Sequence, residues 1–239
     1  MNRQSTTKIV LTVAVCAAVL ALASLTPVGS SAQDPITQNV AAVKQAAAEN
    51  AAALKQYTWV ERTTLSLKGE TKNVTTTQVN YDVEGKLQKT PLSEPSAPDK
   101  KRGLRGKVAG SKTEDMKAYM EQVKALIGEY VPPSPERMQE APAAGRVAVS
   151  SPSADAAQLM FTDYARAGDQ MTLLFDAATK KIRHIDIASA LENKDPVSMK
   201  VEFQALPDGT NYAAVTTVDA PAKQIQVKTE QINFQKVAR

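Results

Sequence analysis

The C-terminal third of the chain, residues 171–237, constrains the fold most because its apolar residues alternate with polar ones. In the segment 197–204, apolar residues occupy every odd position and polar residues every even position. Successive side chains of a β-strand point to opposite faces, so this segment predicts a strand with one apolar and one polar face. The apolar face of such a sheet needs a cover, supplied either by helices of the chain or by a ligand.

Turn residues divide this third into further strands. The turn at 176–180 separates the alternating run 171–175 from 181–187, and Pro207-Asp-Gly209 separates 197–204 from 211–219. In the last run, 225–237, the apolar positions change parity, which predicts a β-bulge near 229–231. Together these runs predict an antiparallel meander.

Residues 36–131 predict more strands and two helices. β-rich runs at 57–67 and 74–83 are followed by the hairpin turn 82–86 and a short strand from Leu87. Apolar residues at helical spacing predict helices over about 36–55 and 113–131, the second preceded by a capping box at Ser111–Glu114. Residues 147–168 fit either a short helix or a strand.

Residues 1–32 have the composition of a secretory signal peptide. Arg3 and Lys8 precede an apolar run at 9–25, and Ser30-Ser-Ala32 supplies small residues at a cleavage site near Ala32. An uncleaved membrane anchor is the alternative. Cleavage would leave 207 of the 239 residues and remove Cys16, so the mature protein is expected to be a cysteine-free domain, 33–239, in a bacterial periplasm or outside the cell.

The charge of the mature chain is nearly balanced. Removal of Arg3 and Lys8 lowers the 29 basic residues to 27 against 25 acidic residues, so nucleic acid is not implied as a partner. A basic segment lies inside a predicted loop and helical insertion at about 93–145. Its cations are expected either to contact anionic lipid headgroups or an acidic partner, or to form a solvated loop; they include Lys100, Lys101, Arg102 and Arg105.

The sequence contains no recognisable catalytic or metal-binding set. His184 is the sole histidine, so sites built from several histidines or from cysteine are excluded in the mature chain. His184 shares a predicted strand face with Asp186, but no nucleophile motif accompanies it. Acidic residues such as Glu192, Asp195 and Glu202 show no characteristic spacing. We therefore expect neither enzymatic activity, cofactor nor metal, with an unrecognised hydrolase as the weakest alternative.

Methionine is the more informative residue type. The mature chain has six methionines against four phenylalanines, mostly on apolar stripes. Flexible and polarizable side chains suit a cavity for variable lipid-like ligands, although ordinary core filling explains each one separately.

The order of elements resembles that of the periplasmic lipoprotein carriers of the LolA type and related sensors. The elements are a signal peptide, an amphipathic helix, strands beginning at Tyr57-Thr-Trp59, a helical insertion, and strands ending at Ile232-Asn-Phe234. The resemblance implies an unclosed β-barrel with helices on its concave face and a hydrophobic cavity for acyl chains. No specific motif carries it, and the family's cavity arginine has no evident counterpart here.

These inferences predict an α+β fold, a curved antiparallel sheet of seven or eight strands covered on its concave face by helices. The expected function is binding of a lipid or lipoprotein, and the alternative is an envelope interaction module with a fully packed core. The residues expected to line the cavity are Trp59, Met116, Met120, Leu173, Phe175, Met199 and Phe203.

Overall fold

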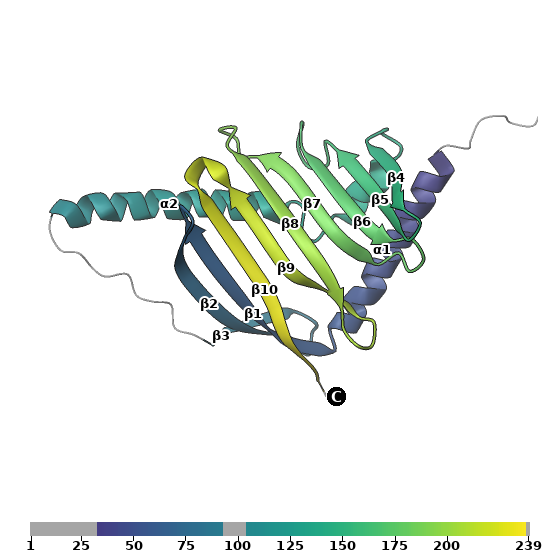
Figure 1. Cartoon of the computed structure of the whole chain (residues 1–239), viewed down its shortest axis with the longest axis horizontal. Helices are drawn as coiled ribbons and strands as arrows, with labels where there is room; N and C mark the ends of the chain where they lie inside the picture. Colours follow the sequence, from purple (N-terminus) through teal and green to yellow (C-terminus); the bar gives the residue numbers. More distant parts are fainter. Residues whose placement is uncertain (1–32, 93–103, 238–239) are drawn as a thin grey trace, which may run out of the picture. The chain divides into compact units, whose positions relative to one another are not determined.

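An antiparallel sheet forms the centre of the computed structural model (Figure 1), which describes residues 33–92 and 104–237, with the backbone alone at 33–34 and 104–113. Its ten strands in these ranges are β1 (Tyr57–Leu67), β2 (Glu70–Tyr81), β3 (Leu87–Pro91), β4 (Val147–Ser153), β5 (Ala156–Thr162), β6 (Gln170–Asp176), β7 (Ile182–Ala190), β8 (Pro196–Ala205), β9 (Asn211–Ala220) and β10 (Ile225–Lys236). The predicted fold class, an unclosed antiparallel sheet with helices, is confirmed.

The strand order joins two segments that are distant in sequence. Strands β4 to β10 follow one another as a meander, and the hairpin β1–β2 with β3 attaches to its far edge, giving the order β3-β2-β1-β10-β9-β8-β7-β6-β5-β4. The junction is the antiparallel pair β1–β10, which aligns Leu67 with Ile225 and Tyr57 with Lys236.

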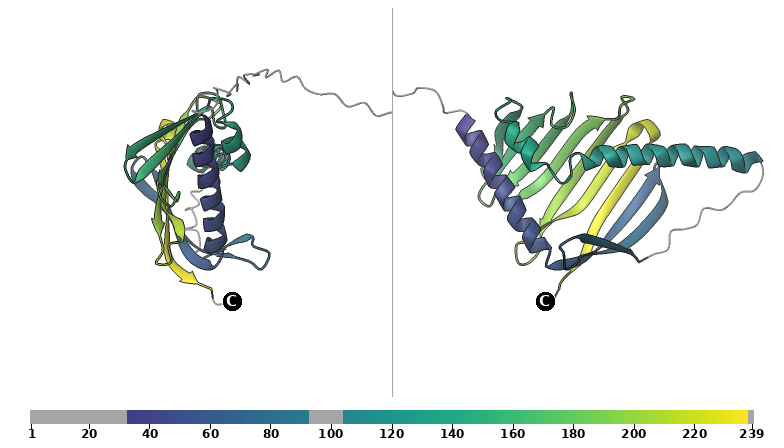
Figure 2. Two further views of the ribbon diagram at one scale, coloured as in Figure 1. Left: turned by 90° about the vertical axis from the view of Figure 1, so that its right-hand side faces the viewer. Right: turned by 180° about the vertical axis from the view of Figure 1, so that it is seen from behind.

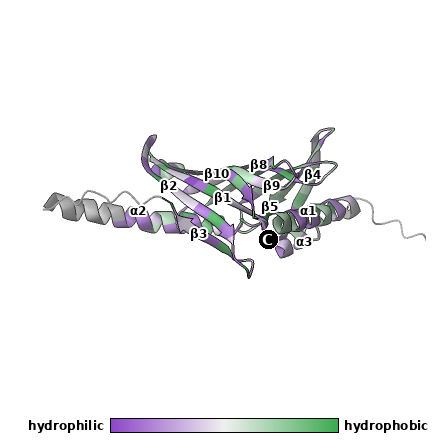
Figure 3. Ribbon diagram, turned by 90° about the horizontal axis from the view of Figure 1, so that it is seen from below, coloured by the Kyte–Doolittle hydropathy of each residue, from purple (hydrophilic) through white to green (hydrophobic). Residues whose placement is uncertain are grey.

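The helices of the described residues lie on one face of the sheet. Helix α1 (Gln33–Leu54) runs directly into β1, α2 (Leu104–Gly128) crosses the upper part of the face, and α3 (Pro135–Glu140) follows α2. The edge-on view in Figure 2 and the view from below in Figure 3 show all three on the same side, toward which the β3 end of the sheet bends. This helix-covered face is called the concave face below.

The core lies between the helices and strands β5 to β8. Alternate residues of these strands are fully buried: Leu159, Phe161, Met171, Leu173, Phe175 and Met199 are at most 1% exposed. Alternation predicted this for β6 and β8, whereas the sequence left β5 open between helix and strand. Helix α1 contributes Val40 and Val43 to this cluster, and α2 contributes Val123 and Leu126. Burial of these side chains is the main force that holds the helices to the sheet.

The structure corrects three expectations. The sheet has ten strands rather than seven or eight, because residues 147–162 form the hairpin β4–β5. Helix α2 begins at Leu104 instead of 113, since helix-favouring residues such as Leu104, Arg105 and Lys107 extend it through the proposed capping box. It ends at Gly128 rather than 131, where glycine and the following prolines disfavour helix.

The bulge in the last strand lies three residues later than expected. Thr58 pairs with Gln235 and Val60 with Ile232, so β10 has one extra residue opposite Trp59. Asn233 there has φ +56°, a left-handed conformation that asparagine tolerates better than most residues. The bulge brings Phe234 onto the concave face, stacked against Trp59 with ring centroids 5.4 Å apart.

Two predictions fall outside the described residues: the signal peptide at 1–32 and the side chains of Lys100, Lys101, Arg102 and Arg105. Among the helices of the described part of the chain, none combines the length and apolar character needed to cross a membrane.

Candidate functional site

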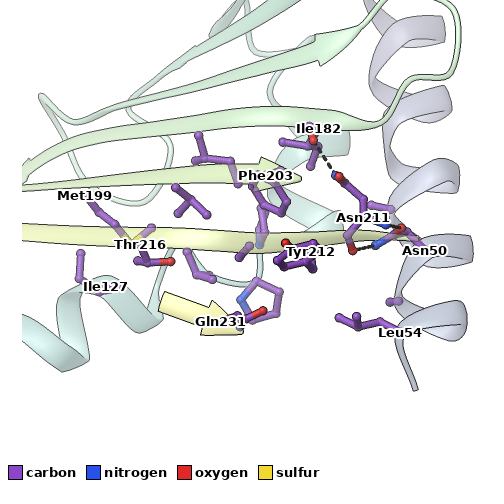
Figure 4. Close-up of a pocket in the computed structure, with 18 of the residues that line it drawn as sticks. Asn50, Leu54, Ile127, Ile182, Met199, Phe203, Asn211, Tyr212, Thr216 and Gln231 are labelled. Atoms are coloured by element: carbon purple, nitrogen blue, oxygen red, sulfur yellow. Dashed lines mark hydrogen bonds between the residues drawn. The ribbon is translucent and has the colours of Figure 1, made fainter. Parts of the chain in front are cut away.

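A pocket of about 570 Å³ separates the C-terminal half of α1 from the sheet (Figure 4). We call it the central pocket. Its floor consists of apolar side chains from β7, β8 and β9, namely Ile185, Met199, Val201, Phe203 and Val218. Its roof is the row Ala46, Ala47, Ala51 and Leu54 on α1, and the segment from Ile127 to Pro133 closes one side.

The pocket exists because the two halves of α1 pack differently. Val40 and Val43 in the first half are 4% and 1% exposed, so this half is seated in the core. Ala47 and Ala51 in the second half remain exposed although they face the sheet. A methyl group is too short to reach the strands, so these small residues leave a gap between the helix and the sheet.

A pair of asparagines holds the second half of α1 in place. The side-chain amide of Asn50 donates to the Asn211 carbonyl oxygen at 2.7 Å, and its oxygen accepts from the Asn211 backbone N–H at 2.6 Å. The Asn211 side chain donates in turn to the carbonyl oxygen of Ile182 at 2.6 Å (Figure 4). These bonds connect α1 to β9 and β7 without filling the space beside them.

A buried polar cluster anchors the opposite side of the pocket, where α2 ends. Asp169 is 4% exposed and accepts hydrogen bonds from the Tyr130 hydroxyl, at 2.5 Å, and from the backbone N–H groups of Tyr164, Ala165 and Arg166. Burial, together with the bond to Asp169, raises the pKa of the Tyr130 phenol. Every oxygen of the carboxylate is used, so this cluster is structural and fixes the segment that follows α2.

The chemistry of the central pocket is mostly apolar. Its lining contains two lysines, Lys124 and Lys181, and no carboxylate or histidine. The Lys181 ammonium donates a hydrogen bond to the carbonyl oxygen of Gly209 at 2.5 Å. One of the two cations therefore already has a partner within the protein. The side-chain oxygen of Gln231 is buried at the pocket and has no hydrogen-bond partner among the described residues. A ligand with a hydroxyl or N–H group would satisfy it.

A second pocket, of about 970 Å³, lies between the middle of α2 and the tips of the hairpins β1–β2 and β9–β10. We call it the hairpin pocket. Its apolar lining consists of Leu65, Leu67, Met116, Met120 and Ile225. The hairpin tips are held together by a backbone hydrogen bond of 2.8 Å from Lys68 to Gln224.

An aromatic cluster forms the lower end of the concave face. Tyr57 and Trp59 of β1 pack with Phe234, and Tyr212 lies 4.4 Å from Phe234 between ring centroids. Tyr212 also lines the central pocket, so the cluster borders it. The Tyr57 hydroxyl donates to Asp208 at 2.5 Å, and this bond is the main reason that the pKa of Tyr57 is raised.

The residues predicted to line one cavity are distributed over four places. Met199 and Phe203 line the central pocket, and Met116 and Met120 line the hairpin pocket. Leu173 and Phe175 are fully buried in the core, and Trp59 belongs to the aromatic cluster. Sequence alternation indicates the face of a residue but not whether the covering helix reaches it.

His184 lies on the face of the sheet opposite the helices. Its Nε2 is 2.9 Å from Oδ2 of Asp186, and both side chains are partly exposed. Glu202 on the neighbouring strand is exposed as well. The described residues contain no cluster of three acidic, histidine or cysteine side chains that could hold a metal ion.

The asparagine pair was not predicted from the sequence, although Asn50 gave a signal. It lies seven residues after Val43, three after Ala47 and four before Leu54, and therefore on the apolar stripe of the helix. A polar residue on such a stripe needs a hydrogen-bond partner once it is near the core. Its partner, Asn211, is 161 residues away and has no comparable signal.

No protein-family model and no curated protein matches the chain. Three solved structures are similar in architecture. A DUF1329 family protein from Desulfovibrio piger has 8% identity and a TM-score of 0.39, covering 87% of this chain and 94% of that one. A LolA superfamily protein from Nitrosomonas europaea has 10% identity and a TM-score of 0.35, covering 88% and 95%.

The third structure, described as an outer membrane lipoprotein-sorting protein domain from Vibrio parahaemolyticus, has 7% identity and a TM-score of 0.39, covering 84% and 93%.

Proposed function

We propose that the protein is an exported, non-enzymatic binding protein that holds the apolar chain of a lipid or an acylated protein in the central pocket. The observation that carries this proposal is the unfilled, aliphatic space of about 570 Å³ between α1 and the sheet. Ligand sites are commonly apolar concavities of roughly 300–1,000 Å³ with a few polar groups.

The affinity of such a site would come from burial of the ligand's hydrocarbon chain. Each methylene group removed from water contributes about 0.8 kcal/mol before the costs of association are subtracted. The pocket needs no rearrangement of the sheet, since its floor is made of packed strands and its roof is held by Asn50. The free oxygen of Gln231 would favour ligands that carry a donor next to the chain.

The lining favours binding over catalysis. Its titratable groups are two lysines and two tyrosines, Tyr81 and Tyr212, and no base or nucleophile pair is formed among them. The alternative function, an envelope module with a fully packed core, predicts no such space. The two pockets therefore support the binding protein over the packed module.

The test is to produce the full chain in a bacterium, purify it from the periplasm and analyse the organic extract by mass spectrometry. We expect a lipid at close to one per chain, and an N-terminus near residue 33 if the leader is cleaved. Ala47→Trp places an indole in the pocket and should reduce bound lipid and the affinity for a fluorescent fatty-acid probe at least tenfold.

Ala48→Trp is the matched control, because Ala48 is exposed on the same helix and does not line the pocket. It should bind like the unmodified protein. A folded protein that carries no lipid and binds no probe would refute the proposal, as would equal loss in both variants.

A further inference from the structure

The hairpin pocket differs from the central pocket in its charge. Its rim carries four lysines, Lys68, Lys72, Lys117 and Lys223, and one acidic residue, Glu121. The central pocket has two lysines around a similar apolar lining. The hairpin pocket is therefore an apolar space with a strongly cationic rim.

The lysines differ in how far they are already engaged. Lys72 pairs with Glu70, and the Lys223 ammonium lies 5.7 Å from the centre of the Tyr119 ring. The Glu121 carboxylate lies 3.8 Å from the Lys124 ammonium. Lys68 and Lys117 have no carboxylate partner within the described residues. At least two cations are thus available to an anion.

The apolar lining lies directly beside these cations. Leu65 and Leu67 are only partly buried, as are Met116 and Met120 on the helix above them. Lys68 follows Leu67 at the hairpin tip, and Lys117 follows Met116 on α2. All of these residues line one pocket, so cations and apolar side chains share it, an arrangement suited to a molecule with an anionic head and a hydrocarbon chain.

We infer that the hairpin pocket is a second binding site, specific for an anionic amphiphile. The hydrocarbon chain of the ligand lies against Leu65, Met116 and Met120. Its acidic head, a carboxylate or a phosphate, is bound by Lys68 and Lys117. This site does not depend on the central pocket, because the two are lined by different residues.

Methionine methyl groups provide a reporter for each pocket. Met116 and Met120 line the hairpin pocket, whereas Met199 lines the central one. We would label the methionine methyl groups with carbon-13 and titrate oleate, oleyl alcohol and a lysophosphatidic acid, in the Ala47→Trp background that blocks the central pocket. Oleate should shift Met116 and Met120, and the uncharged alcohol should bind at least fivefold more weakly at low salt.

Charge reversal on the rim tests the role of the cations. Lys117→Glu should weaken oleate binding at the hairpin pocket about fivefold or more, and the loss should shrink at high salt. Lys200→Glu is the matched control, since Lys200 is exposed on the opposite face and the net charge changes equally. A stronger response to the phosphate than to the carboxylate would identify phospholipids as the source, and the reverse would identify free fatty acids.

Equal binding of oleate and oleyl alcohol would overturn the inference, and so would an unchanged affinity in Lys117→Glu. Absence of shifts at Met116 and Met120 in the presence of all three probes would do the same. None of these outcomes bears on the central pocket, whose test is the lipid extract of the unmodified protein and the comparison of Ala47→Trp with Ala48→Trp.

Discussion

The two ends of the sheet have the same alternating pattern but different surroundings. In β6, Met171, Leu173 and Phe175 on the concave face are completely buried. In β1, Leu65 and Leu67 on the same face are only partly buried. Larger side chains of α1 and α2, such as Val43 and Leu126, join the same core cluster as β6, while alanines of α1 and partly buried methionines of α2 line the two pockets. The size of the covering residues therefore decides whether an apolar strand face becomes core or pocket.

The largest expected difference in the free energy of unfolding is between alanine variants of one leucine near each end of the sheet. Leu173→Ala removes a fully buried side chain and should lower the free energy of unfolding by about 3–5 kcal/mol. Leu65→Ala at the edge of a pocket should cost about 1 kcal/mol, because the leucine already has few neighbours on one side. Urea unfolding of both variants measures the difference. Equal losses would mean that the two ends are packed alike.

The Asp169 cluster should come next in size. Asp169→Asn keeps the shape of the side chain but replaces the oxygen that accepts from Tyr130, Ala165 and Arg166. Buried donors without partners cost roughly 1–3 kcal/mol, so we expect a loss of about 3 kcal/mol. Asp115→Asn on the exposed side of α2 serves as the control and should change little. A loss below about 1 kcal/mol would contradict a structural role for the cluster.

Removing the hydrogen bonds between Asn50 and Asn211 should have a smaller effect on stability. It should also loosen the half of α1 that covers the central pocket. Asn50→Ala deletes two hydrogen bonds to Asn211 and should lower the free energy of unfolding by about 1–2 kcal/mol. Hydrogen exchange should increase in residues 46–54 and remain unchanged around Val40. Gln45→Ala, on the exposed side of the same helix, should leave both measurements unchanged. Uniform exchange along α1 would show that the two halves are not independent.

The smallest effect concerns the turn between β6 and β7. The backbone N–H of Thr179, and then the Arg183 guanidinium, hold the pKa of Asp176 well below its ordinary value of 3.8. A lowered pKa in the folded state stabilises the protein fully above the ordinary pKa, and this contribution is lost as the pH falls toward the folded value.

Wild type should therefore be more stable than Asp176→Asn at pH 7, and the gap should narrow below about pH 4. Urea midpoints at several pH values test this. A gap that stays constant down to pH 2 would mean that the carboxylate charge contributes nothing.

Local signals predicted the strands and turns well. The turn at 82–86 forms as expected, with Gly85 at φ +78° and the Asp82 carboxylate accepting from the N–H groups of Glu84 and Lys86. The face of each residue in β6 and β8 follows from alternation alone. These features depend on neighbours within a few residues, and therefore the sequence contains enough information to place them.

The pockets were not predictable in the same way. Whether Met120 lies in a core or beside a space depends on the distance between α2 and the hairpin tips, which is set by contacts between distant segments. The distance between the second half of α1 and the sheet depends on the hydrogen bond from Asn50 to Asn211, which lies 161 residues along the chain. The position of the bulge in β10 also depends on a distant strand. Counting apolar residues within β10 alone predicted it near 229–231, whereas pairing with β1 places it at Asn233.

The pairing of β1 with β10 has a consequence for how the chain acquires its structure. Thr63 and Thr229 exchange a hydrogen bond of 3.1 Å across 166 residues. Local hairpins can close as soon as they are synthesised, but β1 has to wait for the final strand before its second edge is covered. Until then, an unpaired strand edge and the apolar side of β1 are open to other chains. During synthesis, the N-terminal hairpin therefore keeps one strand edge unpaired until the last strand of the chain has formed.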